Sequence, residues 1–288
     1  MRVLFHFLSR WPLRLLHGLG DLIGWILWLL PKGRRNVAMR NIDLCLPDLP
    51  AAQRRRIARA SVQHEVKTVL EMPVIWLGDA TRVLGLIREW RNKHLLDEAL
   101  AHGKGMILLT LHQGNWEAPA IPFSKDYTAT GLYKPQPGAT IDALSLIGRC
   151  RFGGKMLPAE GGVGRKLIDI LARNETVYFM PDQDPPPGRG VYAPFFGVAA
   201  HTPTLVAKLV QQTGARVVFF YGERLPRGAG FIAHFFAAPE AIYSPDLETS
   251  VAGMNAGLEQ CARDCLEQYW WGYKRFRRRP AGEPRLYD

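Results

Sequence analysis

The amino-acid sequence predicts an α/β protein with a mixed, mostly parallel sheet flanked by helices, preceded by an N-terminal membrane-anchor helix. Beyond His102, short apolar runs alternate with segments of helical periodicity, which is the pattern of a sheet with helices on its faces. The last two apolar runs flank a turn rich in Pro and Gly, so we expect them to form a hairpin that makes the sheet mixed. Near the N-terminus, residues 5–30 are strongly apolar and are followed by a basic run.

The N-terminal apolar segment covers residues 5–30 and ends at Pro31, before the basic residues at 32–35. His17 and Asp21 interrupt it, so the uninterrupted part is shorter than the roughly 18 to 20 residues of a confident membrane span. Its tryptophans and flanking arginines favour a short, tilted or half-inserted anchor helix over the alternative, an ordinary buried helix. The positive charge directly after it places the rest of the chain on the cytoplasmic side of a membrane.

Behind an anchor over residues 1–31, we expect one domain over residues 32–288. A long helix is predicted at 51–77, where apolar residues recur at helical spacing. The predicted strands are residues 106–111, 127–133, 176–180, 216–221 and 231–236. The predicted helices between them are residues 115–123, 139–149, 162–173 and 203–213, with Thr202 as the cap of the last and Pro203 in its first turn.

The charge of the chain points to negatively charged partners. The 288 residues carry 37 Lys and Arg against 26 Asp and Glu, a formal charge of +11, which suits nucleic acid, anionic lipid, a phosphorylated substrate or an acidic carrier protein. The apolar anchor and the absence of a recognisable recognition module argue against nucleic acid. Four scattered cysteines are too few for a disulfide framework and fit a reducing compartment.

The densest group of reactive side chains follows the first buried strand, in the sequence His112-Gln113-Gly114-Asn115-Trp116-Glu117. Open α/β sheets place their ligands at this edge. His112 and Glu117 can converge only across a turn, which Gly114 supplies, while Asn115 caps the next helix. A carboxylate on one ring nitrogen would make the other nitrogen a better base for activating a hydroxyl. The alternative is a histidine that ends a strand and a glutamate that favours a helix N-terminus.

His112 to Glu117 resembles the His-x4-Asp/Glu motif of the glycerolipid acyltransferase superfamily, and the surrounding residues resemble the late acyltransferases of lipid A biosynthesis. The supporting segments, in chain order, are Tyr133-Lys134-Pro135, Gly148-Arg149-Cys150-Arg151, Pro181-Asp182-Gln183-Asp184, Phe195-Phe196-Gly197 and the residues from Glu267 to Pro280. The proline run at 185–187 departs from this pattern. The resemblance implies transfer of a fatty acyl chain from acyl carrier protein to a hydroxyl of a Kdo-bearing lipid A precursor, at the cytoplasmic face of the bacterial inner membrane.

The resemblance also implies roles for individual residues. His112 would be the general base and Glu117 would orient it, while Arg151 and the backbone amides of 114–116 would donate to the thioester oxygen. The residues expected to bind substrate are Asn115, Lys134, Arg149, Arg151 and Asp184.

Two acidic residues, Asp182 and Asp184, follow another buried strand. They could hold a divalent cation, but acyl transfer to an alcohol needs none, so we expect no metal and no cofactor, and we expect Asp184 to anchor loops and basic residues. The expected partners are acyl carrier protein, the phosphorylated acceptor and the membrane surface, and no nucleic acid. The alternatives are another membrane acceptor, such as a glycolipid or ornithine lipid, and a non-catalytic basic protein of the membrane surface.

Overall fold

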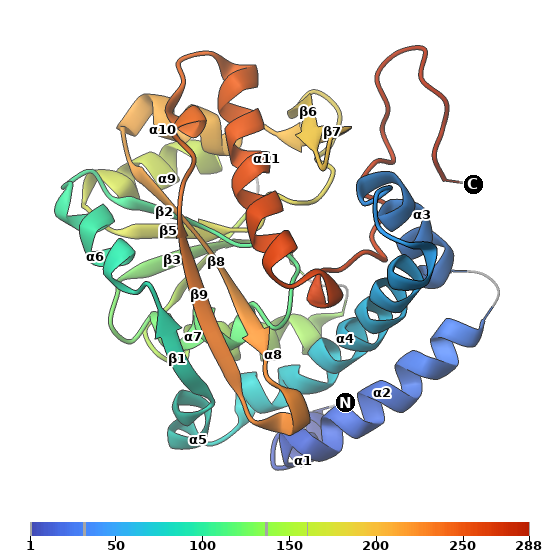
Figure 1. Cartoon of the computed structure of the whole chain (residues 1–288). Helices are drawn as coiled ribbons and strands as arrows, with labels where there is room; N and C mark the ends of the chain where they lie inside the picture. The colour runs from blue at the N-terminus through green and yellow to red at the C-terminus, as the bar shows by residue number, and fades with distance from the viewer. Residues whose placement is uncertain (1, 31–32, 136–137, 160, 288) are drawn as a thin grey trace.

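The computed structural model describes residues 2–30, 33–135, 138–159 and 161–287. Seven strands form the central sheet: β1 (Ile87–Arg91), β2 (Met106–Leu109), β3 (Ala129–Tyr133), β4 (Lys155–Pro158), β5 (Thr176–Phe179), β8 (Arg216–Arg224) and β9 (Phe231–Ala237). Their order in the sheet is β1-β9-β8-β2-β5-β3-β4 (Figure 1). Only β8 and β9 pair antiparallel within this sheet, so the prediction of a mixed, mostly parallel sheet that ends in a hairpin is confirmed.

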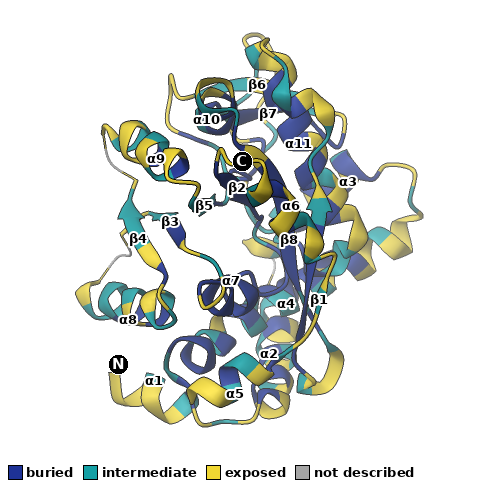
Figure 2. Cartoon of the chain, turned by 90° about the vertical axis from the view of Figure 1, so that its left-hand side faces the viewer, coloured by how far each residue is buried: buried dark blue, intermediate teal, exposed yellow. Residues whose placement is uncertain are grey.

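Helices cover both faces of the sheet. The helices of the described residues are α1 (Arg2–Leu8), α2 (Leu13–Leu29), α3 (Arg34–Cys45), α4 (Ala51–Leu77), α5 (Ala80–Gly85), α6 (His94–Ala101), α7 (Glu117–Phe123), α8 (Ala139–Cys150), α9 (Val163–Ala172), α10 (Leu205–Thr213) and α11 (Leu247–Asp264), of which α1 and α2 pack on α4 rather than on the sheet. Strand β2 is buried on both faces, as its continuous apolar sequence predicts. Ile107 and Leu109 share a core with α9, α10 and α11, whereas Met106 and Leu108 pack with α6 and α7. The central strands β2 and β8 are accordingly dark blue in Figure 2.

Several elements differ from the prediction. The strands β1 and β4 were missed because both lie at the edges of the sheet, where no residue of either strand is fully buried and the apolar signal is weak. A separate hairpin of β6 (Gly190–Phe195) and β7 (Val198–Pro203) was also missed. Helix α10 begins at Leu205, because Pro203 is the last residue of β7 and pairs with Gly190, so the expected cap at Thr202 and first turn at Pro203 were wrong.

The N-terminal segment forms two helices, α1 and α2, which are separated near Pro12. Helix α2 packs lengthwise against α4, and Leu13 and Leu16 are buried in this contact. Gly20 and Gly24 permit the close approach, since a Cβ atom at either position would lie 2.6 Å from α4. The expected boundary at residues 31 and 32 lies outside the described residues, but α2 itself is packed into the fold (Figure 1).

The opposite face of α2 carries exposed apolar side chains, namely Leu15, Leu22, Trp25, Ile26 and Leu29. Within the described residues, no single helix has the length and apolar composition needed to cross a membrane. One bent pair, α2 with α3, meets these criteria jointly, with an angle of 83° between its two helices. Helix α2 therefore agrees better with the expected short or half-inserted helix than with a straight membrane span.

Candidate active site

His112 and Asp182 lie side by side at the carboxyl edge of the sheet. Strands β2 and β5 are parallel neighbours, and their register sets Leu109 opposite Phe179. The third residue after the end of β2 is His112, and the third residue after the end of β5 is Asp182. The Nδ1 atom of His112 lies 2.8 Å from Oδ1 of Asp182, and the backbone N–H of His112 donates to Oδ2 at 2.9 Å. The two residues are thus fixed to each other by side chain and backbone.

The electrostatics of this pair define which nitrogen of the imidazole is basic. Burial raises the pKa of the Asp182 carboxyl, but the charge and hydrogen bonds of His112 outweigh burial and hold this pKa below its usual value. Since an ionised carboxylate only accepts, Nδ1 of His112 must carry the proton that is donated to Asp182. The lone pair of a neutral ring is therefore on Nε2, which lies 3.3 Å from the side-chain nitrogen of Gln183.

Two tryptophans enclose the imidazole. The ring centroids of Trp116 and Trp270 lie 4.8 and 5.4 Å from that of His112, and the His112 side chain is 15% exposed. The backbone of residues 268–271 runs beside residues 112–116, the candidate catalytic loop, where Trp270 N–H donates to the carbonyl of His112. Among the residues that the structure describes, the buried indole nitrogens of Trp116 and Trp270 have no hydrogen-bond partner. Two unsatisfied N–H donors therefore lie on residues that touch the base.

The turn after His112 has the conformation that the sequence predicts. Gly114 has a φ of +57°, and a Cβ atom there would lie 1.9 Å from the carbonyl oxygen of Gly222, so only glycine fits. The side chain of Asn115 accepts the backbone N–H of Ala118, and Glu117 is the first residue of α7. The predicted turn and the position of Glu117 in the first helical turn are confirmed, whereas the N-cap position of α7 is Trp116, and Asn115 accepts from Ala118 from one residue earlier.

The carboxylate of Glu117 points elsewhere than expected. It accepts hydrogen bonds from Arg149 Nε at 2.9 and 3.1 Å, and from the indole N–H of Trp76 at 3.2 Å. The carboxylate that contacts the imidazole is that of Asp182, so the expected contact between Glu117 and His112 is corrected. The five-residue spacing does place His112 and Glu117 near one turn. However, α8 brings Arg149 to the buried Glu117, because the ion pair offsets the free-energy cost of burying the carboxylate.

Of the donors that we expected at the thioester oxygen, Arg151 and the backbone amides of Gly114 and Asn115 are engaged elsewhere. The guanidinium of Arg151 donates to three carbonyls at the end of α4, those of Ile75, Trp76 and Gly78. The backbone N–H groups of Gly114 and Asn115 donate to other backbone carbonyls. These contacts give Arg151 the function of capping α4, because the last carbonyls of a helix lack partners within it.

The other residues expected at the site are dispersed. Asn115 is buried and donates to Glu71, while Lys134 is exposed just after β3. The buried carboxylate of Asp184 accepts from His201, Arg277 and Arg278, so it anchors the basic C-terminal segment as predicted. In the described part of the chain, no group of three or more His, Cys, Asp or Glu side chains is arranged to hold a metal ion.

Two residues of the site were not predicted from the sequence, namely Asp182 as the partner of His112, and Trp270. A signal for Asp182 was present, because both residues directly follow buried strands and two such strands end at one sheet edge if they are parallel neighbours. No signal of this kind was available for Trp270, which is 158 positions from His112 and reaches it through an irregular segment.

Comparison with known proteins gives one consistent result. A family model described as bacterial lipid A biosynthesis acyltransferase matches residues 3–278. The chain is 29% identical over 279 residues to a lipid A biosynthesis lauroyltransferase of Escherichia coli, covering 96% of this chain and 90% of that protein. It is 27% identical to the palmitoleoyltransferase of the same bacterium, over 96% and 89% of the two chains. It is 22% identical to the myristoyltransferase, over 90% and 80%.

Proposed function

Because the chain belongs to the bacterial lipid A biosynthesis acyltransferase family, we propose that it transfers a fatty acyl chain from acyl carrier protein to a hydroxyl of a Kdo-bearing lipid A precursor. The observation that carries the chemistry is the pair of His112 and Asp182 at the sheet edge. It supplies a nitrogen base of fixed tautomer beside a buried carboxylate, which is the equipment needed to activate a hydroxyl.

In the proposed reaction, Nε2 of His112 accepts the proton of the acceptor hydroxyl as its oxygen attacks the thioester carbonyl. A C–O bond forms, the C–S bond breaks, and the proton passes from His112 to the departing thiolate. Asp182 accepts the hydrogen bond of Nδ1 throughout and stabilises the imidazolium that forms between the two transfers. No covalent enzyme intermediate is needed, because both substrates meet at one base.

The thioester oxygen becomes negative in the transition state and needs donors. Since Arg151 and the amides of Gly114 and Asn115 are engaged, we assign this function to the indole N–H groups of Trp116 and Trp270. Their lack of partners supports the assignment, because a buried donor left unpaired costs free energy that a substrate oxygen recovers.

Glu117 acts in this scheme as a positioning residue. Its carboxylate joins α7, which begins right after the catalytic turn, to Arg149 of α8 and Trp76 of α4. The guanidinium of Arg149 also lies over the ring of Trp76, with its central carbon 5.9 Å from the ring centroid. Three helices therefore meet at Glu117, and its loss would displace the turn that carries His112.

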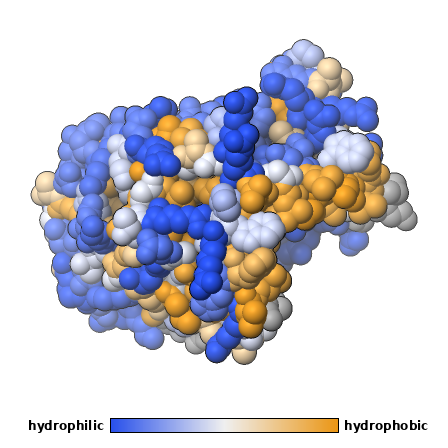
Figure 3. Space-filling view, turned by 90° about the horizontal axis from the view of Figure 1, so that it is seen from below, coloured by the Kyte–Doolittle hydropathy of each residue, from blue (hydrophilic) through white to orange (hydrophobic). Residues whose placement is uncertain are grey.

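We propose that the protein works at the cytoplasmic face of the inner membrane, with the exposed face of α2 in the lipid. Exposed apolar residues of α1, namely Val3, Leu4 and Phe7, extend this surface. Figure 3 shows a band of hydrophobic residues along one side of the molecule, next to strongly hydrophilic side chains. This arrangement is typical of a protein that lies on a membrane rather than crossing it.

The test is acyl transfer by the purified full-length protein, with acyl carrier protein as donor carrier and a Kdo-bearing lipid A precursor as acceptor. Mass spectrometry should detect one added acyl chain, and His112→Ala should lower the rate about 10² to 10⁴-fold without unfolding the protein. Transfer only to an ornithine lipid or another glycolipid would reassign the acceptor. Near-normal turnover by a folded His112→Ala enzyme would refute the general base.

A further inference from the structure

A polar cavity of about 500 Å³ lies where α2, α4 and the β8–β9 hairpin meet. Its volume is within the range of pockets that hold small ligands. Four basic side chains contribute to its lining, namely Arg14 of α2, Lys67 of α4, Arg224 of β8 and Arg227 of the turn between β8 and β9. Two acidic residues, Asp21 and Glu223, also line the cavity, so positive charge exceeds negative charge there.

Two of these basic residues are engaged with acidic partners. Lys67 forms an ion pair with Asp21 at 2.7 Å, and Arg224 donates to the buried Glu71 at 2.6 Å. Glu223 is paired as well, with His234 at 2.7 Å. The charge of Asp21 is therefore neutralised by Lys67, and the carboxylate of Glu223 is hydrogen-bonded to the His234 ring. An anion that enters this cavity meets little repulsion from them.

The other two, Arg14 and Arg227, are exposed, and neither side chain forms a hydrogen bond or ion pair within the described part of the chain. They lie close together, because the hairpin tip packs on the first turn of α2. A Cβ atom at Gly228 would lie 2.4 Å from the backbone nitrogen of Arg14. Two guanidinium groups with free donors at one cavity mouth form a typical recognition site for phosphate, which accepts several N–H groups at once.

His64 adds a neutral donor to the cavity lining. Its Nδ1 lies 2.8 Å from Arg224 Nη1, and arginine can only donate, so the proton of the neutral ring is on Nε2. Burial and the charges of Arg224 and Lys67 hold the pKa of His64 well below its usual value, so the ring is neutral. An uncharged N–H beside guanidinium groups suits a phosphate oxygen or a sugar hydroxyl.

The cavity also lies at the edge of the lipid-facing surface. Arg14 and Gly18, which line it, are on the same helix as the exposed Leu15 and Leu22. A headgroup held there would keep its acyl chains beside the apolar face of α2. Arg224 further connects the cavity to the catalytic loop, since its guanidinium donates to the carbonyl of Gly114 at 3.1 Å.

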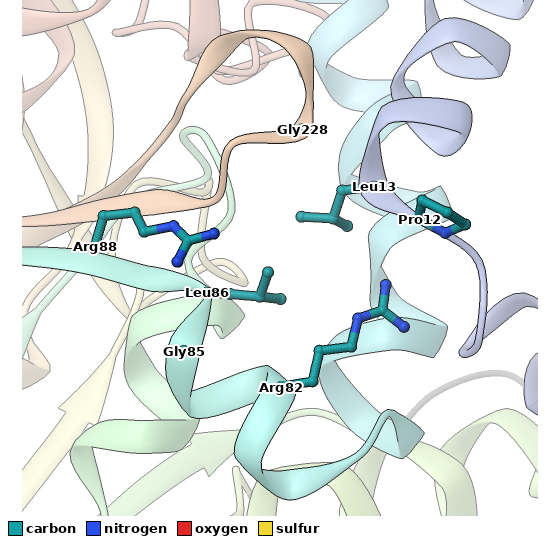
Figure 4. Close-up of a pocket in the computed structure, with 7 residues that line it drawn as sticks. All are labelled: Pro12, Leu13, Arg82, Gly85, Leu86, Arg88 and Gly228. Carbon is teal, nitrogen blue, oxygen red and sulfur yellow. The ribbon is translucent and has the colours of Figure 1, made fainter.

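A second cavity of about 410 Å³, on the other side of the hairpin tip, does not share these properties (Figure 4). Arg88 and Arg82 approach it from β1 and α5, and each guanidinium group already donates to a backbone carbonyl. Arg82 donates to the carbonyls of Ser9 and Trp11, and Arg88 donates to that of Ala229. These contacts hold the N-terminal segment and the hairpin in place and leave the first cavity as the binding site.

We propose that the cavity lined by Arg14, Lys67, His64 and Arg227 binds the phosphate of a lipid headgroup. Its volume leaves room for a sugar that carries the phosphate, which favours the acceptor glycolipid over a membrane phospholipid as its source. The choice of the acceptor rests on the proposed function, whereas the phosphate site itself does not.

The test uses the full-length protein in an uncharged, phosphate-free detergent. Thermal unfolding is followed with three added lipids: phosphatidate, the phosphorylated lipid A precursor and the same precursor after removal of its phosphates. The double variant Arg14→Gln/Arg227→Gln is compared with Arg55→Gln/Arg59→Gln, which removes the same charge from exposed positions of α4 that do not line the cavity. Both pairs should fold, because all four side chains are exposed.

We expect the phosphorylated precursor to raise the Tm of the wild type and of the control pair, and to bind the Arg14/Arg227 variant at least about 10-fold more weakly. A selective effect of this precursor identifies the acceptor as the source, and an equal effect of phosphatidate identifies membrane phospholipid. Equal binding of the dephosphorylated precursor, or unchanged binding by the double variant, overturns the proposal. If the wild type binds the phosphorylated lipid but transfers no acyl chain, the proposed function fails while the site stands.

Discussion

At the scale of single residues, the site is defined by which carboxylate touches the base. Asp182 accepts from both the ring and the backbone of His112, whereas Glu117 is engaged with Arg149 and Trp76. The two acids therefore have different functions, one electrostatic and one positional. The two functions can be distinguished by substitutions that keep the shape of each side chain but remove its charge.

Asp182→Asn should lower kcat about 10² to 10⁴-fold, since an amide can donate to Nδ1 and favour the tautomer whose Nε2 carries the proton. Glu117→Gln should lower kcat less, because a glutamine can still accept from Arg149 and Trp76. Steady-state kinetics with both substrates measures the effect, and circular dichroism verifies folding. If Glu117→Gln proves the more damaging variant, then Glu117 is the true partner of the base.

Trp116→Phe and Trp270→Phe should each lower kcat about 10²-fold with little change in KM, because phenylalanine keeps an aromatic ring but lacks the N–H that we assign to the thioester oxygen. Trp90→Phe is the matched control, since Trp90 stacks on Phe235 at the edge strand β1. Unchanged turnover of both site variants would remove the indoles from the mechanism.

At the scale of secondary-structure elements, α2 is joined to the body of the protein by a buried ionic network. His17 of α2 lies 2.6 Å from Glu71 of α4, and Glu71 also accepts from Arg224 of β8 and Asn115 of the catalytic loop. Deletion of the first 30 residues would therefore leave Glu71 without His17 and would expose the face of α4 that α2 covers. Such a deletion cannot separate membrane binding from folding.

The stability of this joint should depend on pH below about 5. Burial raises the pKa of Glu71, but the charge and hydrogen bonds of Arg224, together with His17, outweigh burial and lower it to about 2. Because the pKa of Glu71 is lower in the folded protein than in the unfolded chain, ionised Glu71 stabilises the fold at pH values above the unfolded pKa. This stabilisation is lost as the pH falls towards 2. It amounts to about 3 kcal/mol in the free energy of unfolding.

Denaturant unfolding of the wild type between pH 5 and 2.5, compared with Glu71→Gln, measures this term. The variant should be less stable at neutral pH, since Arg224 loses its charged partner, and its stability should fall less steeply in acid. If the free energy of unfolding of both proteins falls equally steeply between pH 5 and 2.5, the assignment to Glu71 is wrong.

Membrane attachment should be lost without loss of folding when the exposed face of α2 is made charged. Leu22→Glu/Ile26→Glu places two carboxylates where we expect lipid, while the buried face of α2 is untouched. Ala51→Glu/Gln53→Glu adds the same charge to exposed positions at the start of α4 and serves as control. Vesicle flotation should show release of the first variant only, with the Tm of both near that of the wild type. Full flotation of the first variant would place the membrane surface elsewhere.

At the scale of the whole molecule, the net charge of +11 should govern the encounter with acyl carrier protein, the donor that we propose. Acyl carrier proteins are acidic, and salt screens their attraction to a basic surface. The kcat/KM for the acylated carrier protein should therefore fall several-fold as ionic strength rises from about 0.05 to 0.5 M. An uncharged acyl thioester of pantetheine should show little salt dependence and is the control. Equal salt dependence of the two donors would indicate an effect on the enzyme rather than on the encounter.

The accuracy of the sequence-based prediction follows the range of the interactions involved. Periodicity is local, so α4 was predicted with its observed bounds, and the central strands and the turn at Gly114 were found. Pairing is not local, so the contact of Asp182 with His112 depended on a strand order that the sequence leaves open. Arg151 was misjudged because a basic residue near the site also suits the end of a neighbouring helix.

The contact between the catalytic loop and residues 268–271 has a consequence for biosynthesis. Gly114 donates to the carbonyl of Gln268 and His112 accepts from Trp270, while Arg278 holds the loop that carries Asp184. More than half of the chain separates the base from the segment that encloses it. While the protein is still on the ribosome, β2 and β5 can pair and Trp116 can cover one side of the imidazole, but the contact with Trp270 forms only after residue 271 has emerged. A nascent chain therefore carries an unfinished candidate site until residues 268–271 have joined it.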